Sequence, residues 1–187
     1  MKTKILLGTA ALTALTFMAV EKAGAADADM TAEVIIRKAL EANFTNNLNF
    51  GSLSATAAAG TVTLEPSTNN RTRTGGFNVA GGTAESAVLN VEGDRGATVN
   101  VSVSSLPVVL QHSTGADTLS INQFQVFSSQ SANAETINAA NQAVAFTLPA
   151  QTDSLNILVG ATLSKGASAV AAGTYTSAAV TWNVNYQ

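Results

Sequence analysis

The last fifteen residues of the chain, GTYTSAAVTWNVNYQ from Gly173 to Gln187, alternate between two kinds of side chain. Because successive side chains of a β-strand point to opposite faces, this alternation predicts a strand with one buried face. The strand would close a β-domain at the end of the chain. Its apolar face would carry four residues that are candidates for an assembly strand: Val180, Trp182, Val184 and Tyr186.

The remainder of the chain also favours β-structure. Short runs of β-branched residues recur between turn-forming clusters, a pattern typical of a sandwich or barrel, and they predict about nine or ten strands. Arg71–Ala80 is expected to be a strand with a bulge at Gly75-Gly76, and Gly81-Gly82-Thr83 is expected to be a hairpin loop. We predict an all-β domain over residues 42–187.

The N-terminus predicts export. Lys2 and Lys4 precede an apolar run, and Ala23-Gly24-Ala25 has the small residues of a cleavage site, so residues 1–25 are predicted to be a secretory signal peptide. The run is shorter than the roughly 20 residues that span a bilayer. No later apolar run is long enough to span one, so we expect an exported protein of the periplasm, cell surface or extracellular medium that does not span the membrane.

Residues 26–41 form an N-terminal extension or a first strand. Within TAEVIIRKALE (31–41), the helical spacing of apolar residues and the helix-favouring composition indicate a helix. The β-rich remainder favours a strand, since a first strand can pair with the sheet. We adopt the strand and keep the helix as the alternative. The face of that strand would carry five candidate donor residues for assembly: Met30, Ala32, Val34, Ile36 and Leu40.

Composition argues against several classes of function. Nine Lys and Arg residues, scattered among twelve Asp and Glu, give no basic surface for nucleic acid. The chain has no cysteine and one histidine, His112, so it lacks the ligands of a zinc site and has a single candidate base for a histidine-dependent nucleophile. His112 lies beside a predicted turn and is expected to be a solvated loop residue. We expect no enzymatic activity, no cofactor and no metal.

Five segments occur in an order that resembles a known family. They are Leu48-Asn49-Phe50-Gly51, Gly60–Pro66, Arg73–Val79, Leu158–Ser164 and Ala172–Tyr186. Together they resemble the bacterial domain-of-unknown-function family 4402, and the resemblance covers Val34 to Tyr186. That family has no established activity.

The family's pattern is in turn similar to that of spore-coat-U-like and chaperone–usher fimbrial subunits, through the final Gly-Thr-Tyr strand with its penultimate Tyr186 and the short N-terminal extension. This wider similarity implies an Ig-like antiparallel β-sandwich and a role in a surface fibre. Many fimbrial subunits carry a disulfide, and this chain, without cysteine, cannot form one.

Two functions follow as hypotheses. The first is an exported structural protein, a subunit of a fimbria-like fibre or coat in which an extended segment of one copy completes the sheet of the next. Its partners would be further copies of the chain, as a homo-polymer, or a periplasmic chaperone. The second is a monomeric secreted or periplasmic binding module of the adhesin type, in which the N-terminal segment folds back as a strand of its own domain.

Overall fold

The computed structural model describes residues 30–187, and the signal peptide predicted for residues 1–25 lies outside them. The chain divides into a unit that ends at Ile35 and a unit from Ile36 to Gln187. The described residues of the first unit, 30–35, form neither helix nor strand. The second unit is built from strands alone, and no helix long and apolar enough to cross a membrane occurs in residues 30–187.

The strands follow the chain in this order: β1 (Glu41–Asn46), β2 (Ser52–Leu64), β3 (Arg71–Gly81), β4 (Ala87–Glu92), β5 (Thr98–Val103), β6 (Val108–His112), β7 (Thr118–Ser128), β8 (Glu135–Ile137), β9 (Val144–Thr147), β10 (Ser154–Lys165), β11 (Tyr175–Ser177) and β12 (Trp182–Tyr186). The prediction of an all-β domain is confirmed, with twelve strands in the described residues where about nine or ten were expected. The difference arises from short strands, such as β8, in segments that were expected to be loops.

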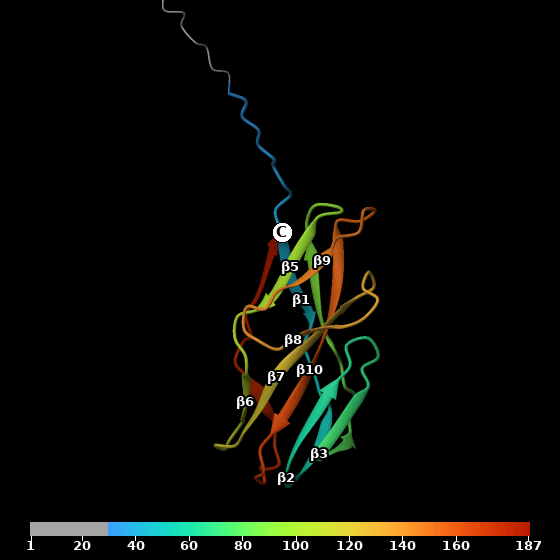
Figure 1. The fold of residues 1–187 in the computed structure, drawn as a ribbon. Coiled ribbons are helices and arrows are strands. Elements are labelled where there is room, and N and C mark those ends of the chain that lie inside the picture. The colour runs from blue at the N-terminus through green and yellow to red at the C-terminus, as the bar shows by residue number, and fades with distance from the viewer. Residues whose placement is uncertain (1–29) are drawn as a thin grey trace, which may run out of the picture. The chain divides into compact units, whose positions relative to one another are not determined.

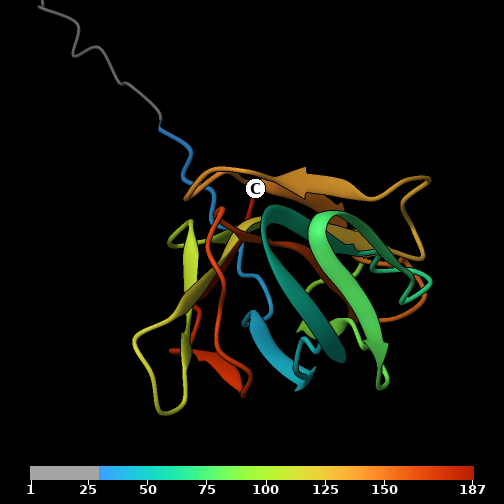
Figure 2. The same ribbon diagram turned by 90° about the horizontal axis from the view of Figure 1, so that it is seen from below.

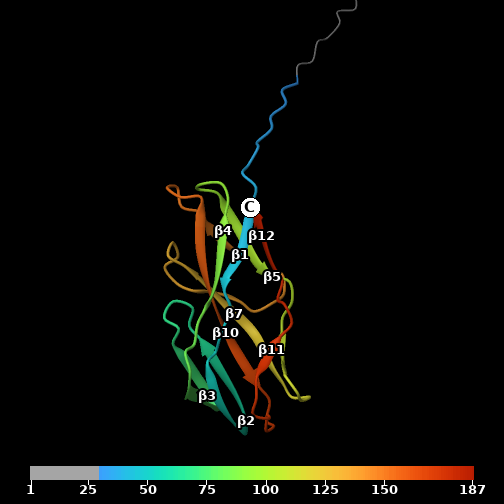
Figure 3. The ribbon, with the colours of Figure 1, turned by 180° about the vertical axis from the view of Figure 1, so that it is seen from behind.

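Every strand pair is antiparallel, and the strands form two sheets of a sandwich (Figure 1). The larger sheet has the order β1-β4-β10-β7-β6-β11, with the β2–β3 hairpin joined to β10 and β8 joined to β7. The smaller sheet has the order β12-β5-β9. Figure 3 shows β12 beside β5 at the end of the unit where the chain terminates.

The long strand β10 organises the larger sheet. Along one edge it pairs with β7. Along the other edge it pairs first with β4, over Ser154–Val159, and then with β2, over Ala161–Lys165. Gly160 lies where the partner changes. β10 therefore runs through two regions with different neighbours.

Alternation within strands builds the core. In β10, Leu155, Ile157, Val159, Ala161 and Leu163 are buried, as the period of two requires. Facing them from the smaller sheet, the alternating valines of β5 are fully buried: Val99, Val101 and Val103.

Two local predictions about the β2–β3 region have different outcomes. The bulge at Gly75-Gly76 is confirmed as a register shift, because Gly75 pairs with Gly60 whereas Phe77 pairs with Ala55. The additional residues lie in β2. The hairpin loop at Gly81-Gly82-Thr83 is wrong, because β3 pairs only with β2 and the next strand, β4, pairs with β1 and β10.

The N-terminal extension also differs from the prediction. Residues 30–40 form neither the strand that we adopted nor the alternative helix, and the first strand begins at Glu41. Apolar alternation shows which side chains could share a face, but a β-strand also requires a hydrogen-bonding partner. Within the described residues of a single copy, the segment before β1 pairs with no neighbouring strand.

Candidate assembly groove

The predicted C-terminal strand is interrupted. Tyr175–Ser177 pairs with β6 of the larger sheet, and Trp182–Tyr186 pairs with β5 of the smaller sheet. Between them, Ala178, Ala179 and Val180 pair with no strand of either sheet. Before the break the half-buried residue is Tyr175, and after it the half-buried positions are 180, 182, 183, 184 and 186. The prediction of one continuous strand is therefore wrong, because the chain crosses from one sheet to the other.

The final strand presents an unpaired edge, since β12 is the outermost strand of its sheet. The Thr181 carbonyl accepts a hydrogen bond from Ser104 N–H (2.9 Å), and Gln187 N–H donates to the Thr98 carbonyl (3.0 Å). The backbone N–H and C=O groups of the odd-numbered residues along β12 therefore point toward β5. Because hydrogen-bonding direction alternates along a strand, the backbone groups of Trp182 and Val184 face away from it.

The first strand presents a second unpaired edge. β1 pairs with β4 on one side and is outermost in the larger sheet. All six of its residues are exposed, including the aromatic side chain of Phe44. In the view of Figure 2, β1 (cyan) projects between β11 (red) and the β2–β3 hairpin (teal and green), and Figure 3 shows β1 next to β12. Each sheet of the sandwich therefore has an outermost strand with one unpaired edge.

A groove of about 450 Å³ lies beside these edges. β1 and the residues after it form one wall, the segment from β11 to β12 forms the other, and the floor is the core. The lining is mainly apolar: Phe44, Asn47, Leu48, Phe50, Ala87, Leu110, Ile121, Phe124, Val159, Tyr175, Thr176, Ser177, Ala178, Ala179, Val180 and Trp182.

A second cavity of about 630 Å³ shares Leu48, Phe50, Leu110 and Tyr175 with the first. It continues along the start of β2 to the 170–174 loop and reaches core residues such as Leu163. The two cavities form one long depression, which we call the assembly groove. Its floor is apolar, as in a core that lacks one covering strand.

Three aromatic rings bound one end of the assembly groove. The Trp182 ring meets Phe124 edge-to-face at a centroid distance of 5.1 Å and Phe44 at 5.8 Å. The Phe44–Trp182 contact joins β1, the outermost strand of the larger sheet, to β12, the outermost strand of the smaller sheet. Trp182 therefore packs against the core, and the groove opens beyond it.

The 170–175 loop, which borders the other part of the groove, is held by polar contacts. Ala171 N–H donates to Asp117 Oδ2 (2.7 Å), and the Tyr175 hydroxyl donates to the Ala171 carbonyl (2.8 Å). Partial burial, and then the nearby Asp117 carboxylate, raise the pKa of the Tyr175 hydroxyl above its ordinary value. The hydroxyl therefore stays protonated and able to donate at neutral pH.

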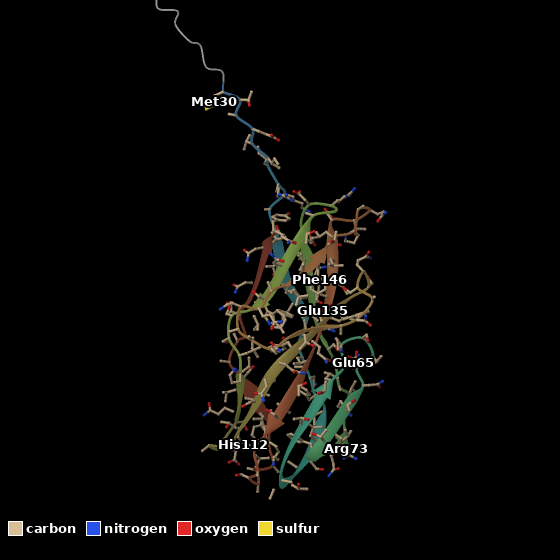
Figure 4. All side chains as sticks on the ribbon, in the orientation of Figure 1. Met30, Glu65, Arg73, His112, Glu135 and Phe146 are labelled. Carbon is tan, nitrogen blue, oxygen red and sulfur yellow. The ribbon has the colours of Figure 1, made fainter. Side chains whose placement is uncertain are left out.

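His112, the last residue of β6, also helps to hold the 170–175 loop. Its Nδ1 accepts from Thr114 N–H (3.2 Å), so the proton lies on Nε2, which donates to the Ala172 carbonyl (3.1 Å). The ring also packs edge-to-face on Tyr175 at a centroid distance of 5.0 Å. His112 lies at the end of the unit opposite Phe146 (Figure 4). It has a structural partner at each ring nitrogen, and the described residues hold no cluster of three acidic or histidine side chains suited to a metal.

The structure separates the predicted donor residues into two groups. Met30, Val34 and Ile36 are 89%, 80% and 89% exposed, and Ala32 is exposed. Leu40 is half-buried and packs against the core of the sandwich. It belongs to the domain itself, so the residues free to enter another core are those from Met30 to Ile36.

The four predicted C-terminal candidates are half-buried and pack against the core: Val180, Trp182, Val184 and Tyr186. The sequence did not reveal the opposite wall of the groove. Phe44, Leu48 and Phe50 occur at even positions of an asparagine-rich stretch, NFTNNLNF, in which Asn46 interrupts the apolar alternation. Their signal was the presence of large apolar residues in a segment that otherwise resembles a loop.

One comparison with known proteins gives a match. A family model described as "Domain of unknown function (DUF4402)" matches residues 40–186. Neither a curated protein nor a solved structure matches the chain. The matched range covers the whole sandwich from Leu40 through Tyr186, including both walls of the groove.

Proposed function

We propose, for a chain that belongs to the DUF4402 family, a role as an exported structural protein of the cell surface or periplasm. In this proposal, copies assemble into a fibre or coat by strand complementation. The observation that carries it is the assembly groove: an apolar depression bordered by backbone that pairs with neither sheet.

The chemistry of the groove favours a strand as its occupant. Backbone N–H and C=O groups require partners, and the residues from Ala178 to Val180 and the free edge of β12 offer them along one wall. An extended peptide can satisfy these groups and place alternate side chains on the apolar floor. A compact apolar ligand would cover the floor and leave the backbone groups unpaired.

The N-terminal segment has the matching properties. Met30, Ala32, Val34 and Ile36 recur with a period of two, and all are exposed. A segment of this pattern can bury one apolar face and pair its backbone at the same time. Further copies of the chain are therefore the proposed partners, in keeping with the donor role expected for these residues.

The test compares the chain from Ala26 with a chain that begins at Arg37, using size-exclusion chromatography with light scattering over a range of concentrations. We expect concentration-dependent oligomers from the first and monomers from the second. Far-UV circular dichroism would verify that the shorter chain keeps its β-structure. A chain from Ala26 that stays monomeric at high concentration would contradict the proposal and support the alternative, a monomeric binding module.

Two adjacent isoleucines give a matched control. Ile36→Asn places an amide on the proposed donor face, whereas Ile35→Asn makes the same change on the opposite face. Strand complementation predicts that Ile36→Asn weakens assembly much more than Ile35→Asn. Equal losses would indicate non-specific hydrophobic association.

A further inference from the structure

The root of the N-terminal segment is fixed to the sandwich by a set of contacts that we call the Tyr186 clamp. Lys38 N–H donates to Asp94 Oδ1 (2.8 Å), and the Tyr186 hydroxyl donates to the Lys38 carbonyl (2.9 Å). The same hydroxyl accepts from Asp94 N–H (2.8 Å). The Lys38 ammonium pairs with Asp153 at 2.7 Å, and the Arg37 guanidinium lies 5.2 Å from the centre of the Tyr186 ring.

The clamp joins parts of the chain that are distant in sequence. Asp94 belongs to the turn between β4 and β5, Asp153 precedes β10, and Tyr186 ends β12. Glycine at position 93 makes the approach possible, because a side chain there would collide with the Tyr186 hydroxyl. The two backbone groups of Lys38 are both engaged by the Asp94–Tyr186 pair, as expected for an extended residue whose N–H and C=O point the same way.

Strand complementation could occur within one copy or between two. Within one copy, the segment before Ile36 would have to run back along the free edge of β1, which begins at Glu41. That hairpin would require a reverse turn within residues 37–40. In the structure, residues 36–40 contain no turn or bend, and the clamp holds the middle of this stretch.

We propose that Tyr186 is a positioning residue that makes strand donation intermolecular. By holding Lys38 in an extended backbone, it disfavours the hairpin that would fill the groove of the same copy, and so keeps the segment before Arg37 for another copy. The inference rests on the proposed function, because it concerns which copy receives the segment.

The test uses the full chain as exported and processed by a bacterial host. Because the chain has no cysteine, Val34→Cys and Ala178→Cys together report which groove holds the segment. A disulfide within one copy and a disulfide between copies separate on a non-reducing gel. The pair is introduced into the wild-type chain, into Tyr186→Phe, which keeps the ring but removes the hydroxyl, and into Thr63→Val. The last is a control that removes one hydroxyl of the partly buried Thr63–Thr162 hydrogen bond, remote from the clamp.

We expect disulfides between copies in the wild type and in Thr63→Val. In Tyr186→Phe we expect the ratio of internal to intermolecular disulfides to rise about tenfold, as the loss of a strong hydrogen bond allows. Asp153→Asn, which alters only an exposed pair, should cause a smaller shift in the same direction and keeps the test valid if Tyr186→Phe fails to fold.

An unchanged ratio in both clamp variants, with intact assembly, would overturn the role of Tyr186 and leave the proposed function standing. Internal disulfides already predominant in the wild type would also overturn it. A wild-type chain that forms no oligomer would contradict the proposed function, and this inference with it.

Discussion

The strand β10 passes through two regions of the sandwich that are closed to different degrees. From Leu155 to Ile157 it pairs with β4 and lies under the β12-β5-β9 sheet, where the valines of β5 are fully buried. From Val159 to Leu163 it lies beneath the assembly groove, and beyond Gly160 it pairs with β2. The same alternation of side chains serves both regions. The difference is that the first has a complete cover and the second lacks a strand.

The strongest test of this comparison is one substitution made in each region. Leu89→Ala in the covered region removes a fully enclosed side chain, and we expect a loss of about 2–5 kcal/mol in the free energy of unfolding. Leu110 lines the groove, and its side chain is already half-exposed. Leu110→Ala should therefore lower the free energy of unfolding by less, while it weakens assembly. Urea denaturation and light scattering measure the two effects. Equal losses of stability would indicate that the groove is filled within a single copy.

A second test concerns the junction of the two regions. At Gly160, a side chain would collide with the Leu64 carbonyl oxygen and meet Pro66, because the chain after β2 passes over this point. Gly160→Ala should therefore lower the free energy of unfolding by about 1–3 kcal/mol. Gly166→Ala, where an added methyl group would meet nothing, is the control. A harmless Gly160→Ala would mean that β2 and β4 can move apart at the junction.

A third test concerns the end of β10 in the groove region. The buried Lys165 ammonium donates to the Thr56, Ala58 and Gly166 carbonyls at 2.7–3.0 Å and so supports the bulge of β2. Lys165→Met would leave these carbonyls with fewer partners, at a cost of about 1–3 kcal/mol. Arg95→Met, on an exposed turn, should cost much less in the same thermal or urea unfolding measurement. Similar effects would show that the bulge is stable without the ammonium.

The two regions also differ in how far the sequence predicts them. The period of two in β10 and β5 is a local property, so strands and buried faces were accessible to sequence reasoning. The crossing at Ala178-Ala179 was not, because small residues fit either face and the alternation continues through the break. Which sheet each half joins depends on β6 and β5, which lie far away in the sequence.

The assembly groove, too, could be predicted only in part from local sequence patterns. A donor can be inferred from one segment, since Met30 to Ile36 carry their own pattern. The acceptor is assembled from residues of β1, β6, β7, β10 and the C-terminal segment, and no local pattern links them. The Tyr186 clamp joins positions 38, 94, 153 and 186, so it too depends on the tertiary fold.

The smallest expected effect lies in the covered region, at the Lys38–Asp153 pair of the clamp. The hydrogen bond from the Lys38 ammonium lowers the pKa of the Asp153 carboxyl, and the same bond raises the pKa of Lys38. The stabilisation is thus present between the ordinary carboxyl pKa of about 4 and the ordinary ammonium pKa of about 10. It is lost as the pH falls through the lowered pKa of Asp153 or rises through the raised pKa of Lys38. Because both groups are exposed, thermal unfolding at neutral pH should separate the wild type from Asp153→Asn only slightly, and the difference should vanish in strong acid or high salt. A difference that persists in strong acid would assign the effect of the substitution to packing rather than to charge.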